Sequence, residues 1–252
     1  MVEAIQYHPQ HSNSLSSSSN SNTYEFPNKL SVPNTLEYLT KTPELGIDTS
    51  LLQTLSSDMV ASSVILFSNS EKSGAYNPEV SSIGISALPH SEKNNGAYVA
   101  QQISTLAHEM SHARDHIELH QFDSGLTNNL GKGAELSSIK ALYRTELKAW
   151  VVEAMQCKLS KSTTNRMDLL LASAKQGISG VINSETNTFN SRIMAYKAQA
   201  GLPESWGADK ILDKTKLKSN LDNALQLFEK TEIQSTDDAQ HFLKELDMIF
   251  ND

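Results

Sequence analysis

The feature that most constrains this 252-residue chain is the run His108-Glu109-Met110-Ser111-His112, which has the form H-E-x-x-H. It lies in a segment, from just after Asn94-Asn95-Gly96 to about His120, whose apolar residues recur every three and four positions and predict an α-helix. Residues four apart on a helix are separated by about 40° and about 6 Å of rise, so both imidazoles can reach one tetrahedral metal ion. The pair also lies roughly opposite the apolar stripe, which favours metal ligands over core histidines. A solvated polar face is the alternative.

Glu109 stands beside the two histidines, where its carboxylate can hold a water molecule and accept its proton. This combination of residue types and spacing is typical of zinc hydrolases, and it predicts one Zn²⁺ ion. Cys157 is the single cysteine of the chain, so neither an internal disulfide nor a cysteine-based zinc site is expected.

Catalytic zinc usually takes three protein ligands, so the motif needs one further donor. His116 lies about 12 Å along the helix from the first histidine of the motif, too far to share its ion, and His120 is farther still. Glu118 could reach the metal only if the chain turned sharply, but Asp115 occupies the position where a glycine would permit that turn. Asp115 is expected at the surface, with orientation of a ligand histidine as the alternative.

The better donor lies in a second predicted helix, at residues 134–159. Glu146 falls on the shoulder of the apolar stripe of that helix, where burying a carboxylate is costly unless a cation accompanies it. Ala149, one turn later, is small enough to allow close approach to the histidine helix. Glu153 shares the shoulder and is the second candidate, and for both residues a position at the rim of an amphipathic helix is the alternative.

The remaining pattern predicts a mostly helical α+β fold. Buried strands are expected at residues 62–68 and 81–88, joined by a turn-rich connection, and the simplest arrangement is a small antiparallel sheet packed on the H-E-x-x-H helix. Short helices are expected around residues 35–40 and 49–57. The carboxyl-terminal part, residues 160–252, is expected to add helices at 166–175, 185–200, 209–230 and 237–250.

Residues 1–33 contain a serine- and asparagine-rich run that is predicted to be disordered, ahead of a single domain at residues 34–252. An ordinary flexible terminus and a secretion leader are equally compatible with this composition. The first residues lack the basic segment and apolar run of a Sec signal peptide, and no apolar stretch of about 18 residues predicts a membrane span. The net charge of −8 argues against a nucleic-acid partner.

The form H-E-x-x-H followed by E-x-x-A, here at His108–His112 and Glu146–Ala149, resembles the gluzincin group of zinc metallopeptidases. With the serine-rich leader, the compact size and the strand pair before the motif, residues 62–156 look most like bacterial effector proteases of the NleD type. The resemblance implies a zincin-like domain and cleavage of a host intracellular protein, with signalling kinases as one substrate class. It also implies secretion without a Sec signal and delivery into the host cytoplasm; otherwise the protein would be cytoplasmic.

The predicted mechanism assigns zinc to His108, His112 and Glu146, and proton transfer to Glu109 as general base and then acid. The strand near residues 83–88 could pair with an extended substrate. A side chain that stabilises the oxyanion is expected, and the candidates are Tyr143, Arg144 and Tyr196. The rival interpretation is a non-catalytic helical binding or adaptor protein, with or without a structural metal.

Overall fold

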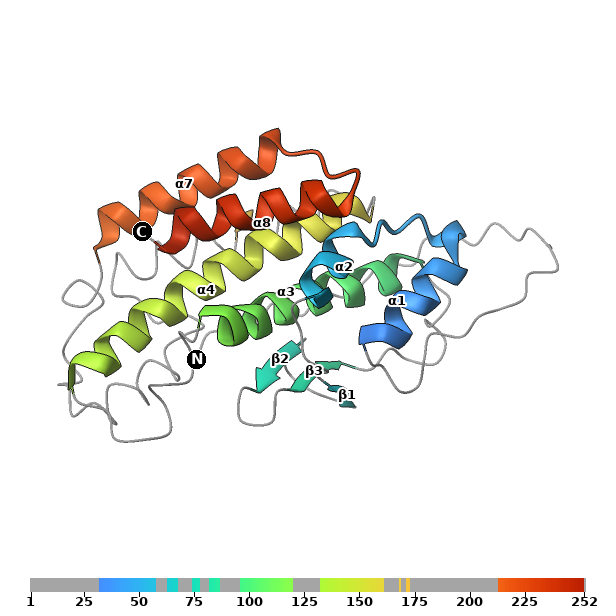
Figure 1. Ribbon diagram of the computed structural model, residues 1–252, viewed down its shortest axis with the longest axis horizontal. Helices are drawn as coiled ribbons and strands as arrows, with labels where there is room; N and C mark the ends of the chain where they lie inside the picture. The colour runs from blue at the N-terminus through green and yellow to red at the C-terminus, as the bar shows by residue number, and fades with distance from the viewer. Residues whose placement is uncertain are drawn as a thin grey trace.

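The computed structural model describes residues 32–57, 63–67, 74–77, 82–86, 96–119, 132–160, 168, 171–172 and 213–251. The predicted leader before Val32 and the helix predicted at residues 185–200 lie outside these ranges, as does most of the helix predicted at 166–175. Over the described residues the chain is mostly helical, as predicted, with a few short strands beside the helices (Figure 1).

Two short helices precede the strands, two long helices follow them, and a further pair lies near the carboxyl terminus. They are α1 (Val32–Lys41), the 3₁₀ helix η1 (Pro43–Leu45), α2 (Ser50–Ser57), α3 (Gly96–Leu119), α4 (Lys132–Leu159), α7 (Lys214–Lys230) and α8 (Thr236–Asn251). All except η1 overlap helices predicted from the sequence.

Three strands pair in the order β1 (Ser63–Phe67), β3 (Ser82–Ser86), β2 (Gly74–Asn77). β1 and β3 are parallel, whereas β2 is antiparallel to β3. The prediction that the two buried strands form an antiparallel sheet is therefore wrong. The connection predicted as turns contains β2, and at residues 68–81 it is long enough for the crossover that parallel pairing requires.

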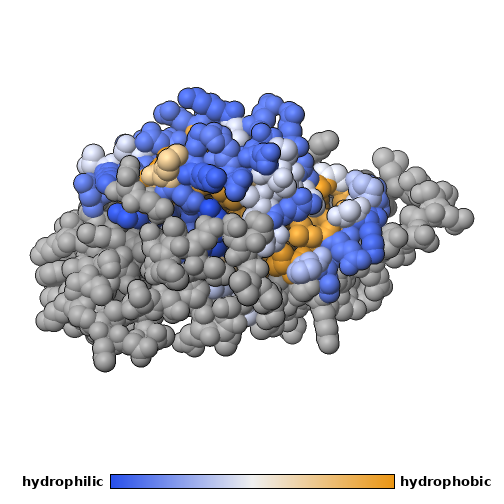
Figure 2. Space-filling view, in the orientation of Figure 1, coloured by the Kyte–Doolittle hydropathy of each residue, from blue (hydrophilic) through white to orange (hydrophobic). Residues whose placement is uncertain are grey.

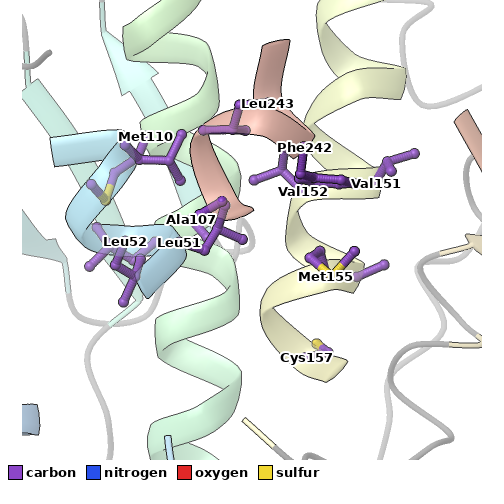
Figure 3. Close-up of a cluster of buried hydrophobic side chains, with 14 of the residues drawn as sticks. Leu51, Leu52, Ala107, Met110, Val151, Val152, Met155, Cys157, Phe242 and Leu243 are labelled. Carbon is purple, nitrogen blue, oxygen red and sulfur yellow. The ribbon is translucent and has the colours of Figure 1, made fainter. Parts of the chain in front are cut away.

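Helix α3 lies at the centre of the fold, with β2 and β3 packed on one side and α4 on the other (Figure 1). Helix α8 contacts both α2 and α4, so chain segments that are far apart in sequence form one hydrophobic core around α3. Figure 3 shows apolar side chains from α2, α3, α4 and α8 meeting in this core, namely Leu51, Leu52, Ala107, Met110, Val151, Val152, Met155, Cys157, Phe242 and Leu243. Because α3 has neighbours on both sides, its histidine face is buried as well as its apolar stripe.

The carboxyl-terminal pair of helices begins with side-chain caps. Asp213 accepts a hydrogen bond from the backbone N–H of Lys216 (3.0 Å) at the start of α7, and Ser235 accepts one from the N–H of Asp238 (3.2 Å) at the start of α8. Figure 2 shows mainly hydrophilic side chains on the outer surface over these helices. Among the helices that the structure describes, none combines the length and apolar character needed to cross a membrane.

Candidate metal centre

Helices α3 and α4 contribute five acidic and histidine side chains to one cluster. α3 contributes His108, Glu109 and His112, α4 contributes Glu146 and Glu153, and all five are buried. Ala149, which follows Glu146 by one turn, is fully buried. A side chain this small lets two helix backbones approach closely, and long charged side chains on each can then meet across the interface.

Three donor atoms of this cluster form a triangle of the size that a metal ion requires. His108 Nε2 lies 3.2 Å from His112 Nε2, and each nitrogen lies 3.6 Å from Glu146 Oε2. Tetrahedral ligands at bond lengths of about 2.1 Å would be separated by about 3.4 Å. The two imidazoles and the carboxylate therefore fit a divalent cation both in spacing and in ligand chemistry, and this group could hold a metal ion.

Glu153 occupies a different place in the cluster from Glu146. Its Oε2 lies 3.0 Å from Nδ1 of His108, on the edge of the ring opposite the metal-facing nitrogen. The contact has ion-pair distance but lies off the N–H direction, so it is not a hydrogen bond. Of the two carboxylates predicted as the third donor, the structure places Glu146 beside both Nε2 atoms and Glu153 behind His108.

The charges of the cluster shift the pKa values of His108 and Glu146 in opposite directions. Burial acts to lower the pKa of His108, but Glu146 and Glu153, with a smaller contribution from Glu109, outweigh it and raise this pKa well above its usual range. Burial acts to raise the pKa of Glu146, but the imidazoles of His112 and His108 outweigh it and hold this pKa well below its usual range. Without a metal, these opposite shifts favour a proton on His108 and a negative charge on Glu146.

Glu109 lies next to this donor triangle and has a raised pKa. Burial is the main cause, and the nearby carboxylates of Glu146 and Glu153 add to it, whereas the two histidines act in the opposite direction. A carboxyl group whose pKa is raised towards neutrality is a better proton acceptor than an ordinary surface glutamate. Strand β2 passes directly over this carboxyl group, a neighbour that the sequence did not reveal because β2 was predicted as turn.

The structure tests only some of the predictions made for the other candidate residues. Helix α3 continues to Leu119 without the sharp turn that Glu118 would need to join the donors. The side chains of His116 and Glu118, and the whole of His120, lie outside what the structure describes. The same holds for the side chain of Tyr143 and for Tyr196, which leaves Arg144, partly buried, as the described oxyanion candidate.

Asp115 is fully buried, so its predicted surface position is wrong. It accepts a short hydrogen bond from Lys148 of α4, and Lys148 also donates to Asp247 Oδ1 of α8 at 2.7 Å. Arg114 donates to the other oxygen of Asp247 at 2.8 Å. These four residues form a four-charge network that the sequence did not reveal, because Asp247 of α8 meets Arg114 and Lys148 only in the folded chain.

No protein-family model matches the sequence, and no curated protein and no solved structure matches it either.

Proposed function

We propose that the protein is a zinc-dependent endopeptidase with a zincin-like fold. The observation that carries the proposal is the buried triangle of His108 Nε2, His112 Nε2 and Glu146 Oε2. The buried carboxyl group of Glu109 is close enough to interact electrostatically with all three residues. Two imidazoles and one carboxylate are a donor set typical of catalytic zinc, which keeps a further position for water or substrate. The resemblance to NleD-type effectors extends the proposal to a host intracellular protein as substrate, reached without Sec export.

Each residue of the cluster has a separate part in this reaction. His108, His112 and Glu146 would hold the zinc ion, which when bound supplies Lewis-acid polarisation of a peptide carbonyl and lowers the pKa of water. Glu109 accepts a proton from the attacking water on its carboxylate and then donates it to the leaving amine nitrogen. Glu153 steadies the ring of His108 from the Nδ1 edge.

The sheet supports a revised position for the substrate. β3 was predicted to accept an extended peptide, but it already pairs with β1 on one side and β2 on the other, so its backbone groups are engaged. In the described sheet, β2 is the edge strand on the side nearer Glu109. An extended peptide that added to the outer edge of β2 would run beside the proposed proton acceptor.

Metal analysis of the purified protein tests the metal part of this proposal. We expect about one zinc per chain in the wild-type protein and in Glu109→Gln, because Glu109 is not a zinc donor. We expect His112→Ala to lose zinc, since it removes one corner of the triangle. Wild-type protein that contains no zinc and does not bind added zinc would exclude the metal site.

Identification of new protein termini tests the proteolytic part. Cells that express the wild-type protein should contain cleaved peptides that are absent from cells expressing Glu109→Gln at the same level. Both proteins keep the zinc site, so the comparison isolates proton transfer from metal binding. Identical sets of termini, together with bound zinc in both proteins, would instead favour the binding or adaptor protein with a structural metal.

A further inference from the structure

Strand β2 contacts the carboxyl group of Glu109 through a glycine. A Cβ atom built on Gly74 would lie 2.6 Å from Oε1 and 3.0 Å from Cγ of Glu109, and 2.8 Å from Cγ2 of Thr105. Real Cβ atoms essentially never approach other heavy atoms this closely, because these separations are inside van der Waals contact. The strand and the helix can lie this close only because residue 74 has no side chain.

The conformational freedom of glycine is not the reason that residue 74 is a glycine. Of the glycines that the structure describes, Gly46 has a positive φ of 65°, and Gly74 does not. Gly74 is ordinary extended backbone, paired with Ile85 in the antiparallel ladder. The requirement at this position is therefore space rather than an unusual backbone conformation.

The strand has little freedom to retreat from Glu109. Its partner strand β3 carries Ile83 and Ile85, both essentially fully buried, and β2 and β3 both pack against α3. Moving β2 away would open this packing, whereas the carboxyl group of Glu109 can turn about its side-chain bonds. A methyl group at residue 74 would therefore displace the carboxyl group more readily than the strand.

We propose that Gly74 is a positioning residue for Glu109: its backbone, which carries no side chain, lies against the Glu109 carboxyl group and keeps it near the histidine pair. This contact restricts the rotation of the Glu109 side chain and helps to exclude water from one side of it. The catalytic consequence of this role rests on the proposed peptidase function, but the contact itself does not.

The substitution Gly74→Ala tests the catalytic consequence, with Gly96→Ala as its matched control. A Cβ at Gly96, the first residue of α3, would meet only Cδ2 of Leu45 at 3.7 Å, an ordinary contact. On a peptide that spans a cleavage site found in cells, we expect Gly74→Ala to lower kcat at least about 10-fold with KM changed less, because misplacing a proton-transfer group acts on the chemical step. Zinc content should stay at the wild-type value. Unchanged kcat in Gly74→Ala would overturn the proposal.

A second variant separates Glu109 from its neighbour on the same helix. Thr105→Ser removes the Cγ2 atom that a Cβ at residue 74 would also meet. If Glu109 is the group displaced, Gly74→Ala combined with Thr105→Ser keeps most of the loss in kcat. Full recovery of kcat in this double variant would assign the effect to the Thr105 methyl group and overturn the proposal.

A double-mutant cycle on metal-free protein tests the contact without any assumption about activity. Gly74→Ala should lower Tm by about 5 °C in the wild-type background, as overpacking of a close contact does. In the Glu109→Ala background the two closest Glu109 atoms are gone, so the same substitution should cost about half as much. Equal losses of Tm in the two backgrounds would overturn the contact between residue 74 and Glu109. If the losses differ as expected but no cleavage site is found in cells, the result would count against the peptidase function alone.

Discussion

Two buried polar clusters both draw side chains from α3 and α4, and they balance their charges differently. In the four-charge network, Asp115 and Asp247 accept hydrogen bonds from Lys148 and Arg114, whose cationic groups act only as donors. In the metal cluster, Glu146 and Glu153 face the imidazole nitrogens of His108 and His112, whose charge depends on a proton.

This difference separates a structural cluster from one that can exchange its cation. The lysine ammonium and the arginine guanidinium are donors with no acceptor atom, so the network holds α3, α4 and α8 together but offers no nitrogen ligand to a metal ion. The proton on His108 can leave, and the raised pKa of this residue shows how strongly its surroundings favour a positive charge there. A metal ion can take the place of that proton, because the same nitrogen then becomes a ligand.

The largest effect is expected from breaking the structural cluster. Lys148→Ala leaves the fully buried Asp115 without its lysine, and we expect a loss of about 4 kcal/mol in the free energy of unfolding. Urea denaturation monitored by circular dichroism measures it. Lys244, which is exposed on α8, supplies the control, and Lys244→Ala should change stability by less than about 0.5 kcal/mol. A similar small change for Lys148→Ala would show that the network contributes nothing to the fold.

The next largest effect is expected on zinc affinity when a donor is removed from the metal cluster. Glu146→Gln should weaken zinc binding at least about 100-fold, because loss of a ligand exceeds the cost of losing an outer partner. Competition titration against a chelator measures the affinity. The metal-free protein should lose less stability than Lys148→Ala does, because an amide can still accept a hydrogen bond and His108 can release its proton when the carboxylate is gone. Unchanged affinity would remove Glu146 from the donor set.

A smaller effect is expected from the carboxylate behind His108. Glu153→Gln should weaken zinc binding about 10-fold, as substitutions of groups that orient a ligand usually do. The same titration compares it with Glu146→Gln. If Glu153→Gln had the larger effect, the roles of the two glutamates would have to be exchanged.

The smallest effect concerns pH. The pKa of His108 is raised in the folded protein, so its contribution to the stability of the metal-free form is complete below its ordinary pKa of 6.5 and is lost as pH rises through the raised value. Zinc requires the neutral imidazole, so added zinc should raise Tm more at pH 8 than at pH 6. Calorimetric titration in buffers of different ionisation enthalpy should detect release of the proton. Glu153→Gln should reduce that release, and a zinc-induced rise in Tm that is equal at pH 6 and pH 8 would contradict this assignment.

The local parts of the fold and of the site could be predicted because they depend on spacing along one helix. The three- and four-residue periodicity located α3 and α4, and the spacing of His108 and His112 put both rings on one face. Glu146 could be singled out because a carboxylate on an apolar shoulder implies a nearby positive charge.

The predictions that were wrong concern residues whose neighbours in the fold are far away in sequence. β1 and β3 can pair in parallel because the chain passes through β2, at the outer edge of β3, before it reaches β3. The alternation of apolar residues does not encode this path. Asp115 looked exposed because its partner Lys148 comes from another helix, α4. Gly74 looked like a turn residue because the need for a glycine there comes from the proximity of Glu109. In each case the deciding interaction is tertiary.

The long sequence separation between Asp247 and its partners also bears on the order of folding steps during synthesis of the chain. Asp247 pairs with Lys148 across 99 positions and with Arg114 across 133, so neither contact can form until the ribosome has extended the chain well beyond α4. Contacts between such distant positions slow folding, because a long loop must close before they stabilise anything. A nascent chain that already contains all of the donor residues would therefore still lack the contacts that hold their two helices to α8, and docking of α8 would be among the last steps of folding.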